Sequence, residues 1–295
     1  MPFGMRNAPA TFQRYMNTVI RGLKRTKVYI DDIIIYSDTW EEHLLAIGAL
    51  FERLSEYRLT VNLNKCVFCQ GTVKFLGHTI GQGSVAPLES KIEAIGSYTI
   101  PQNKKSLMRF LGIAGFYLRF CPNFSHIVSS LTNLLKKEVR YVWSEECQRA
   151  FESVKAVLTN NPVLKAPDFD LAFLLYCDAS DVGIGAVLVQ LGEDGIEHPV
   201  SYYSKKLNGA QSRYSTVEKE ALALLLSLQH FSVYLGKTNR VVVYTDHNPL
   251  TFLARMKTGN QRLLRWALTL QEHNLDVRHI KGSENVVSDA LSRID

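Results

Sequence analysis

Two adjacent carboxylates stand between two β-prone apolar runs near the start of the chain. Residues 28–36 read VYIDDIIIY, so Asp31 and Asp32 interrupt side chains that favour strands. The pattern predicts a hairpin with this pair at its turn. Burial of two neighbouring carboxylates is costly, and hard cations such as Mg²⁺ relieve their repulsion. We therefore expect Asp31 and Asp32 to be metal ligands with a catalytic role; an exposed hairpin tip is the alternative.

Four further acids lie in the second half, at positions where acids are unexpected. Asp178 and Asp246 each end an apolar strand, and adjacent parallel strands would bring both to one edge of a sheet. Glu220 and Asp289 lie on the apolar faces of their predicted helices. Such a quartet suits two divalent ions, Mg²⁺ or Mn²⁺, which can activate water and stabilise the leaving oxygen of a phosphodiester. A helix cap or a core acid paired with Arg is the alternative for any one of them.

Basic side chains could hold a polyanion. Lys104, Lys105 and Arg109 open one predicted helix, and Arg262 and Arg265 lie on a later one. Residues 1–143 carry 18 Lys and Arg against 10 Asp and Glu, a net charge of +8, while the remaining residues carry 16 against 18, or −2. We expect these five side chains to contact nucleic-acid phosphates. A solvated helix face is the alternative for each.

Composition indicates a globular protein. The 295 residues are 46% hydrophobic and 21% charged, which allows two or three domains with a real core. No apolar run approaches the roughly 20 residues of a membrane span, and no signal-peptide pattern opens the chain. The odd number of cysteines suits a reducing compartment. Cys66 and Cys69 form a lone CxxC pair with no second pair to complete a zinc site.

Hydrophobic periodicity predicts a mixed α/β protein without internal repeats. The first half is expected to contain helices at 12–20, 41–57, 88–95, 104–120 and 127–135 and strands at 60–63 and 73–80. A domain boundary is expected near residues 139–143. The second half is expected to contain strands at 172–177, 183–190, 200–204, 241–245 and 275–280, and helices at 145–158, 215–234, 250–254, 262–273 and 285–292.

Several motifs resemble those of one known family. PFGxxNAPATFQ at residues 2–13, YIDD at 29–32 and FLGH at 75–78 are similar to successive motifs of reverse transcriptases from gypsy-type LTR retrotransposons. DAS at 178–180, EKEALA at 218–223, YTDHNPL at 244–250 and DALSR at 289–293 are similar to motifs of their ribonuclease H domain. The motifs occur in the family order over essentially the whole chain.

The resemblance implies an α/β architecture in three parts. These are a partial α+β palm (residues 1–80), a thumb-like helical segment (81–140) and a ribonuclease H-like domain with a mixed sheet and flanking helices (141–295). Asp31 and Asp32 would match two polymerase metal ligands. Leu76 and Gly77 would match the hairpin that positions the primer end, and so would contact nucleic acid. The quartet of later acids would match the nuclease carboxylates.

The resemblance also implies an incomplete polymerase site in this chain. The family palm has a third catalytic Asp on an earlier strand and a fingers subdomain, and both would precede Met1. The expected activity is therefore metal-dependent endonucleolytic cleavage of RNA in RNA/DNA hybrids, attached to a truncated RNA-directed DNA polymerase. Two alternatives are a working part of that polymerase, if the upstream parts are supplied, and a non-catalytic nucleic-acid-binding remnant.

The partners implied by this resemblance are an RNA/DNA hybrid and a primer-template, with no membrane. A second copy of the chain and other parts of the pol polyprotein are further partners that the resemblance allows. The location expected is intracellular, in the cytoplasm, a virus-like particle or the nucleus.

Overall fold

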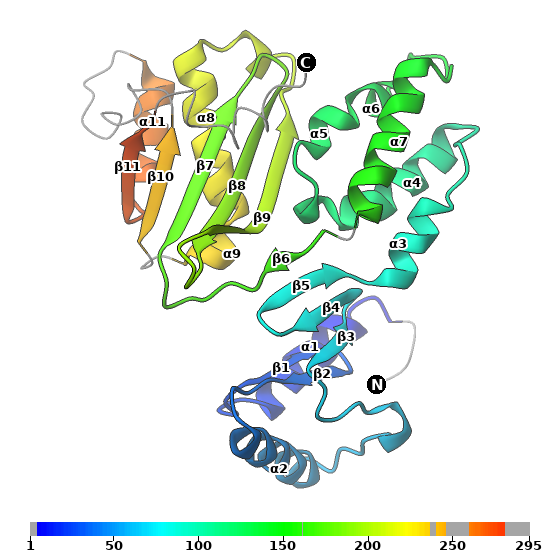
Figure 1. The fold of residues 1–295 in the computed structure, drawn as a ribbon, viewed down its shortest axis with the longest axis vertical. Helices are drawn as coiled ribbons and strands as arrows, with labels where there is room; N and C mark the ends of the chain where they lie inside the picture. The colour runs from blue at the N-terminus through cyan, green and yellow to red at the C-terminus, as the bar shows by residue number, and fades with distance from the viewer. Residues whose placement is uncertain (1–4, 161, 237–239, 246–259, 281–295) are drawn as a thin grey trace. The chain divides into compact units, whose positions relative to one another are not determined.

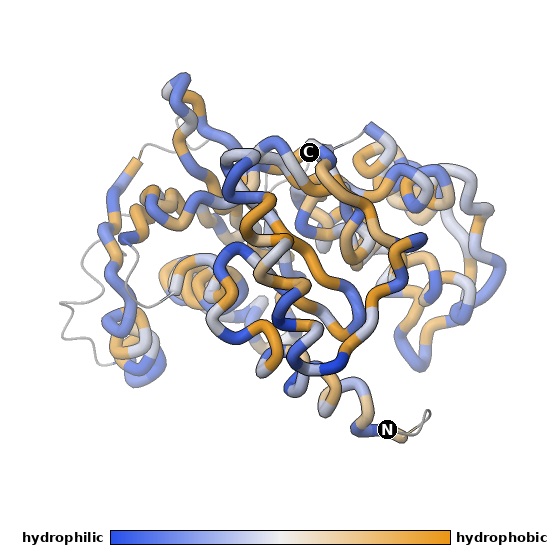
Figure 2. Tube along the Cα trace, turned by 90° about the horizontal axis from the view of Figure 1, so that it is seen from below, coloured by the Kyte–Doolittle hydropathy of each residue, from blue (hydrophilic) through white to orange (hydrophobic). Residues whose placement is uncertain are grey.

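The computed structural model describes residues 5–160, 162–236, 240–245 and 260–280 (Figure 1). The chain divides into two compact units, Met1–Gln82 and Gly83–Asp295. The five cysteines, all within the described ranges, are free thiols. No helix in the described ranges is long and apolar enough to cross a membrane. Hydrophilic and hydrophobic residues instead alternate over short distances along the chain (Figure 2).

The first unit is built from two helices and two hairpins. Its elements are α1 (Ala8–Val19), β1 (Thr26–Tyr29), β2 (Asp32–Ile35), α2 (Trp40–Glu56), the short 3₁₀ helix η1 (Leu63–Lys65), β3 (Thr72–Phe75) and β4 (His78–Gly81). β1 pairs antiparallel with β2, and β3 pairs antiparallel with β4. The core of the unit contains the buried residues Met16, Val19, Leu50 and Leu54. Both helices therefore bury one side against the first hairpin.

Three expectations for the first unit were wrong in detail. α1 begins at Ala8, earlier than predicted, because Pro9 is tolerated in a first helical turn. Residues 60–63 form no strand; the Asn62 side chain accepts a hydrogen bond from the Asn64 amide (3.1 Å) and opens η1. The predicted strand at 73–80 is folded into the β3–β4 hairpin.

The second unit begins with a helical segment. Its elements are β5 (Ser84–Pro87), α3 (Glu89–Gly96), α4 (Lys104–Phe116), the 3₁₀ helix η2 (Leu118–Phe120), α5 (Phe124–Ile127), α6 (Ser129–Leu134), α7 (Glu145–Thr159) and β6 (Leu164–Lys165). α7 packs against α3, α5 and α6. The rings of Phe110 on α4 and Phe151 on α7 lie 4.7 Å apart between centroids. The predicted helix at 127–135 is instead two short helices, α5 and α6.

A five-stranded mixed sheet forms the rest of the second unit. The strands are β7 (Phe173–Ala179), β8 (Gly183–Leu191), β9 (Glu197–Lys206), β10 (Val241–Thr245) and β11 (Leu275–His279), in the order β11-β10-β7-β8-β9. β7, β8 and β9 are antiparallel neighbours, and β10 is parallel to both β7 and β11. The helical elements are η3 (Gln211–Arg213), α8 (Thr216–His230), α9 (Ser232–Leu235) and α11 (Gln261–Leu270).

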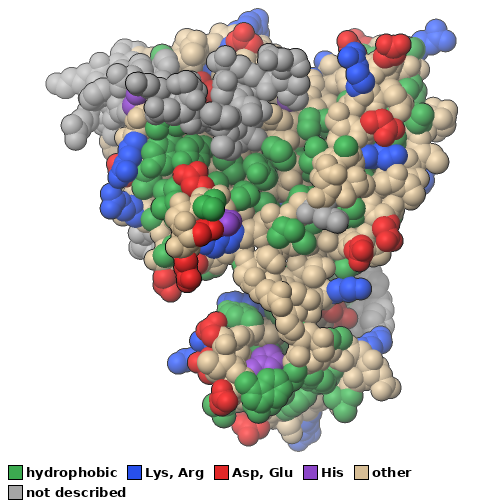
Figure 3. Space-filling view, in the orientation of Figure 1, with side chains coloured by type: hydrophobic (Ala, Val, Ile, Leu, Met, Phe, Trp, Pro, Cys, Tyr) green, Lys and Arg blue, Asp and Glu red, His purple; other side chains and the backbone are tan. Residues whose placement is uncertain are grey.

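The sheet separates its side chains into two faces by the alternation of β-strands. Phe173, Leu175 and Cys177 face α8 and α11 in one apolar core. Leu174 and Val242 belong to a second apolar cluster, with the partly buried side chains Tyr176, Tyr202 and Tyr244 packed against it. Figure 3 shows hydrophobic side chains gathered over the sheet on the side turned to the viewer, opposite α8. Successive residues of β7 therefore point alternately to the two faces of the sheet.

Hydrogen bonds join the helical segment to the edge strand β9. The amide of Ser125 donates to Ser204 Oγ (2.8 Å). The ammonium of Lys206 donates to Ser129 Oγ (2.6 Å) and to Asn133 Oδ1 (3.2 Å). The helices and the sheet are thus parts of one packed unit.

Candidate metal centre and basic surfaces

Asp178 occupies the penultimate position of β7. It shares a face with Leu174 and Tyr176, because alternate residues of a strand point the same way. Its side chain is buried, with 4% of the residue exposed. A carboxylate so placed at the end of an apolar strand needs polar or ionic partners.

Glu220 brings a second buried carboxylate to the end of β7. α8 begins with a capping box, in which Ser215 Oγ accepts from the Glu218 amide and the Glu218 carboxylate accepts from the Ser215 amide (3.0 Å). Glu220 follows Glu218 by two residues and is 4% exposed. Its Oε1 accepts a hydrogen bond from the amide of Ala179 (3.3 Å). Glu220 thus faces the sheet, and the bond places it beside the end of β7.

β10 is the parallel neighbour of β7, as the strand-end argument required. The pairing runs from Val241 opposite Phe173 to Tyr244 opposite Tyr176. The predicted ligands Asp246 and Asp289 lie outside the described residues, as do the predicted helices at 250–254 and 285–292. Within the described ranges, no group of three or more His, Cys, Asp or Glu side chains could hold a metal ion.

The first turn of α8 makes a second contact with the segment that follows β7. The Lys219 ammonium donates to Asp181 Oδ1 (2.6 Å). The Lys219 side chain is 9% exposed, whereas that of Asp181 is 94% exposed. Hydrogen bonding and charge from Lys219 hold the pKa of Asp181 below its ordinary value. Asp181 is thus exposed but has a specific partner.

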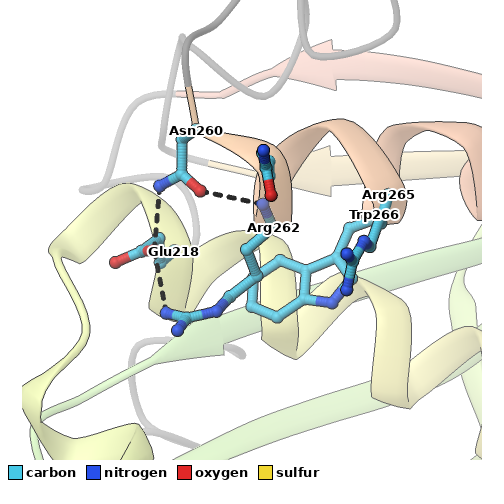
Figure 4. A pocket seen from close by; sticks show the side chains of 6 residues that line it. Glu218, Asn260, Arg262, Arg265 and Trp266 are labelled. Carbon is cyan, nitrogen blue, oxygen red and sulfur yellow. Dashed lines mark hydrogen bonds and ion pairs between the residues drawn. The ribbon is translucent and has the colours of Figure 1, made fainter.

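Glu218 ties α8 to the start of α11. Its Oε1 accepts from Asn260 Nδ2 (3.0 Å) and from the guanidinium of Arg262 (3.0 Å), as the dashed lines in Figure 4 show. Hydrogen bonding from Asn260, followed by that from the Ser215 amide, holds the pKa of Glu218 below its ordinary value. The Arg262 guanidinium also lies 4.1 Å from the centroid of the Tyr214 ring. The charge of Arg262 is therefore partly balanced within the protein.

A pocket of about 530 Å³ opens beside this cluster. Its lining includes Glu218, Asn260, Gln261, Arg262, Arg265 and Trp266. Arg265 is exposed on α11, one residue before the half-buried Trp266. Both arginines predicted to contact phosphates are exposed, and Arg262 is paired with Glu218.

The β1–β2 hairpin presents its acids to solvent. Tyr29 pairs with Asp32, so the turn consists of Ile30 and Asp31, and Asp32 is the first residue of β2. Asp31 and Asp32 are both exposed. The Gln13 side chain on α1 accepts from the Ile30 amide (2.6 Å) and donates to the Val28 carbonyl (3.1 Å). The expectation that both acids form the turn is therefore corrected, and neither carries the cost of burial.

The β3–β4 hairpin turns on Leu76 and Gly77, between the paired residues Phe75 and His78. Both central residues have positive φ, 48° and 78° respectively. Positive φ at both positions is the signature of a type I′ turn, which suits the twist of a hairpin. A leucine is rarely found in this conformation, and strained positions of this kind concentrate at functional sites.

The three predicted basic residues of α4 differ in their surroundings. The Lys104 ammonium donates to the Lys136 carbonyl (2.6 Å), which gives it a structural partner. Lys105 and Arg109 are exposed on the same helix. Phe116, two helical turns after Arg109 on α4, is 57% exposed. An accessible stripe of α4 thus combines two cations with an aromatic side chain.

The sequence reasoning missed Lys219, Asp181 and Asn260 as parts of this region. The available signal was the charged triplet Glu218-Lys219-Glu220 inside an otherwise apolar helix. A buried Lys at that position needs a nearby acid to pair with. Its partner, Asp181, follows β7, far earlier in the sequence, and only the fold brings the two together.

Comparisons with known proteins find relatives for both parts of the chain. Residues 1–80 match the family described as reverse transcriptase (RNA-dependent DNA polymerase), and residues 168–273 match the RNase H-like domain found in reverse transcriptase. The chain is 42% identical over 298 residues to the retrovirus-related Pol polyprotein from transposon 297 of Drosophila melanogaster. It is 39% identical over 299 residues to the transposon Tf2-3 polyprotein of Schizosaccharomyces pombe.

The chain contains a reverse transcriptase domain and an RNase H-like domain and is similar to retrotransposon Pol polyproteins. All of it aligns with both relatives, and it spans 28% of the length of the first and 22% of the second. The reverse transcriptase and ribonuclease H-like domains expected from the motifs are confirmed.

Solved structures confirm the α/β fold class of this chain. The foamy viral protease-reverse transcriptase in complex with dsDNA matches 96% of the chain, with a TM-score of 0.81 and 24% identity, over 60% of the viral chain. The same viral protein in complex with an RNA/DNA hybrid matches 96% of the chain, with a TM-score of 0.80 and 24% identity, over 39% of the viral chain. At this level of identity the likeness establishes the fold.

Proposed function

We propose that the second unit hydrolyses the RNA strand of an RNA/DNA hybrid. The observation that carries this proposal is the hydrogen bond from the Ala179 amide to Glu220 Oε1, which sets two buried carboxylates, Asp178 and Glu220, at one end of β7. The RNase H-like match over residues 168–273 supports it. The hybrid named for the foamy viral relative supports this choice of substrate.

Asp178 and Glu220 fit a divalent-cation site by their chemistry. Carboxylate oxygens are the ligands that hard divalent ions prefer, and burial lowers the number of competing waters. We propose that Asp246 and Asp289 complete the ligand set. The register of β10 with β7 supports this for position 246, which follows Tyr244 by the same two residues that separate Asp178 from Tyr176.

We propose that two Mg²⁺ or Mn²⁺ ions bind there, and when bound they would activate water and stabilise the leaving oxygen of a phosphodiester. In this reaction the protein holds the two carboxylates in place. Glu220 is oriented by the Ala179 amide, and Asp178 is held by the pairing of β7 with β8. The exposed cations Lys105, Arg109 and Arg265 would hold the phosphates of the hybrid.

The test is cleavage of labelled RNA in a hybrid, with Mg²⁺, by the chain and by Asp178→Asn. The substitution keeps the size of the side chain and removes its charge, so cleavage should fall by about 100-fold or more. Glu193→Gln, in an exposed turn, is the matched control and should cleave as the unaltered chain does. Full activity in Asp178→Asn would rule out the proposed site.

We further propose that Asp31 and Asp32 serve RNA-directed DNA synthesis in the longer polyprotein. The reverse transcriptase match over residues 1–80 and the strained Leu76–Gly77 turn support this role. Primer extension by a polyprotein that includes this segment should be lost in Asp31→Asn. Extension by residues 1–295 alone would show that these residues suffice, against the expectation that the site is incomplete.

The competing proposal is a nucleic-acid binder without activity. It predicts equal affinity for the hybrid with and without Mg²⁺, and no cleavage. An intracellular location, in the cytoplasm, a virus-like particle or the nucleus, is part of our proposal and fits the free cysteines. A homodimer would appear as a doubled mass in sedimentation.

A further inference from the structure

Three consecutive residues at the start of α8 contact three different segments. Glu218 binds Asn260 and Arg262 at the start of α11. Glu220 binds the Ala179 amide at the end of β7. Lys219, between them, binds Asp181 in the turn after β7. Successive residues of a helix point about 100° apart, so one helical turn can reach all three segments.

The Lys219–Asp181 pair is unusual in its burial. Lys219 places a charged group where 9% of its side chain is exposed, which is costly unless the ammonium is paired. Its partner is almost fully exposed. The ion pair therefore offsets a desolvation cost that falls on Lys219 and hardly at all on Asp181. The same contact holds the turn that bears Asp181 against α8.

The turn after β7 is closed by its own hydrogen bonds. Ser180 Oγ accepts from the Val182 and Gly183 amides (3.3 and 3.1 Å), and the Ser180 amide donates to the Gly183 carbonyl (2.9 Å). The ion pair at Asp181 therefore also constrains the end of β7, where Asp178 lies three residues earlier. The hydrogen bonds within the turn oppose rotation of its backbone.

We propose that Lys219 is a positioning residue, whose ion pair with Asp181 sets Asp178 at its working distance from Glu220. The inference rests on the proposed nuclease function and deepens it. Two adjacent attachments, Lys219 to Asp181 and Glu220 to Ala179, clamp the end of β7 against α8. A single attachment would leave the strand end free to pivot about it.

Position and charge predict opposite results when Lys219 is removed. A positive charge beside two carboxylates repels cations, so its loss alone would tighten Mg²⁺ binding. Loss of a positioning contact instead weakens metal binding, commonly by 10- to 100-fold for residues that orient ligands. The direction of the change therefore separates the two roles.

The experiment titrates Mg²⁺ against Lys219→Met, Lys219→Arg and the unaltered chain. Met fills a similar volume, and the exposed Asp181 is then hydrated, so the variant should fold. We expect Lys219→Met to need about tenfold more Mg²⁺ for half-maximal cleavage, with an unchanged KM for hybrid, and Lys219→Arg to need less than Lys219→Met. Lys155→Met, which removes a Lys whose side chain is 18% exposed on α7, is the control and should not shift the midpoint.

A second readout does not depend on cleavage. Mg²⁺ should raise the Tm of the unaltered chain, because a ligand that binds the folded state stabilises it. Lys219→Met should need about tenfold more Mg²⁺ for the same rise. Asp181→Asn should behave as Lys219→Met does, and the double variant should be no worse than either single one, because one contact is lost in all three.

The outcomes separate the two proposals. A chain that cleaves hybrid, with a midpoint for Lys219→Met that is unchanged or lower, would overturn the positioning role and leave the nuclease intact. A chain that does not cleave, but whose Mg²⁺-induced rise in Tm is weakened by Lys219→Met, would overturn the nuclease and support the positioning role.

Discussion

Acidic side chains in the two units have opposite environments. Asp31 and Asp32 are exposed on their hairpin, whereas Asp178 and Glu220 are each 4% exposed. Buried carboxylates that share one site gain most from cations, because the low dielectric strengthens every interaction. At the residue scale, the second unit therefore holds the acids better prepared for metal chemistry.

Glu218 offers a residue-scale test of pH dependence. Asn260 helps to hold the pKa of Glu218 below its ordinary value, so the pair stabilises the fold above the unfolded pKa, near 4.3, and this contribution is lost as the pH falls through the folded pKa. Asn260→Ser keeps a helix cap on α11 but removes the amide donor. It should lower the free energy of unfolding by about 1 kcal/mol at pH 7.

Urea unfolding at pH 7 and pH 3 checks this expectation. The difference between Asn260→Ser and the unaltered chain should be smaller at pH 3, because Glu218 takes up a proton as the pH falls through its lowered pKa. A difference of equal size at the two pH values would show that the amide does not act through the carboxylate.

Elements decide which groups reach a ligand. α8 presents three charged residues from a single turn, and α4 presents the exposed Lys105 and Arg109 beside a Lys104 that is bound to the Lys136 carbonyl. The same helix thus contains cations with a structural partner and cations exposed to solvent. Only the exposed ones are expected to change nucleic-acid affinity.

The double variant Lys105→Ala/Arg109→Ala tests α4 as a phosphate-binding element. Hybrid affinity should fall, and the slope of log affinity against log salt should decrease by about 2, one for each lost phosphate contact. Fluorescence anisotropy at several salt concentrations measures both. Lys91→Ala, an exposed change on α3, is the control. An unchanged slope in the double variant would mean that α4 does not touch the backbone.

At the scale of the whole molecule, each unit has its own core. Met16, Val19, Leu50 and Leu54 serve the first unit, while the sheet and α8 form a separate core in the second. All four proposed nuclease acids belong to residues 83–295. The chemistry should therefore be separable from the first unit.

A fragment of residues 83–295 should fold and cleave hybrid with roughly the same kcat as the whole chain, because a unit with its own core can fold alone. Circular dichroism melting and single-turnover cleavage check the two parts of this expectation. A fragment that melts without a cooperative transition would show that the second unit depends on the first.

Local pattern determined much of this protein. The apolar run at residues 173–177 predicted a strand, the apolar face around Glu220 predicted its direction, and the helix predicted from residue 215 matches the start of α8. These features depend on neighbours one to four residues away, which the sequence displays directly. The motifs within residues 1–80 and 168–273 predicted the reverse transcriptase and RNase H-like domains.

Tertiary structure decided what depends on distant partners. Gln13 holds the Ile30 amide from another element, and the observed register places Asp32 on the strand instead of in the turn. The partner of Lys219 lies 38 residues earlier, after a different strand. Helical and strand periodicity describe which side of an element is buried, and packing alone selects which buried side chains meet. For this reason the acids of α8 and β7 were predictable from the sequence, whereas the ion pair that clamps them together was not.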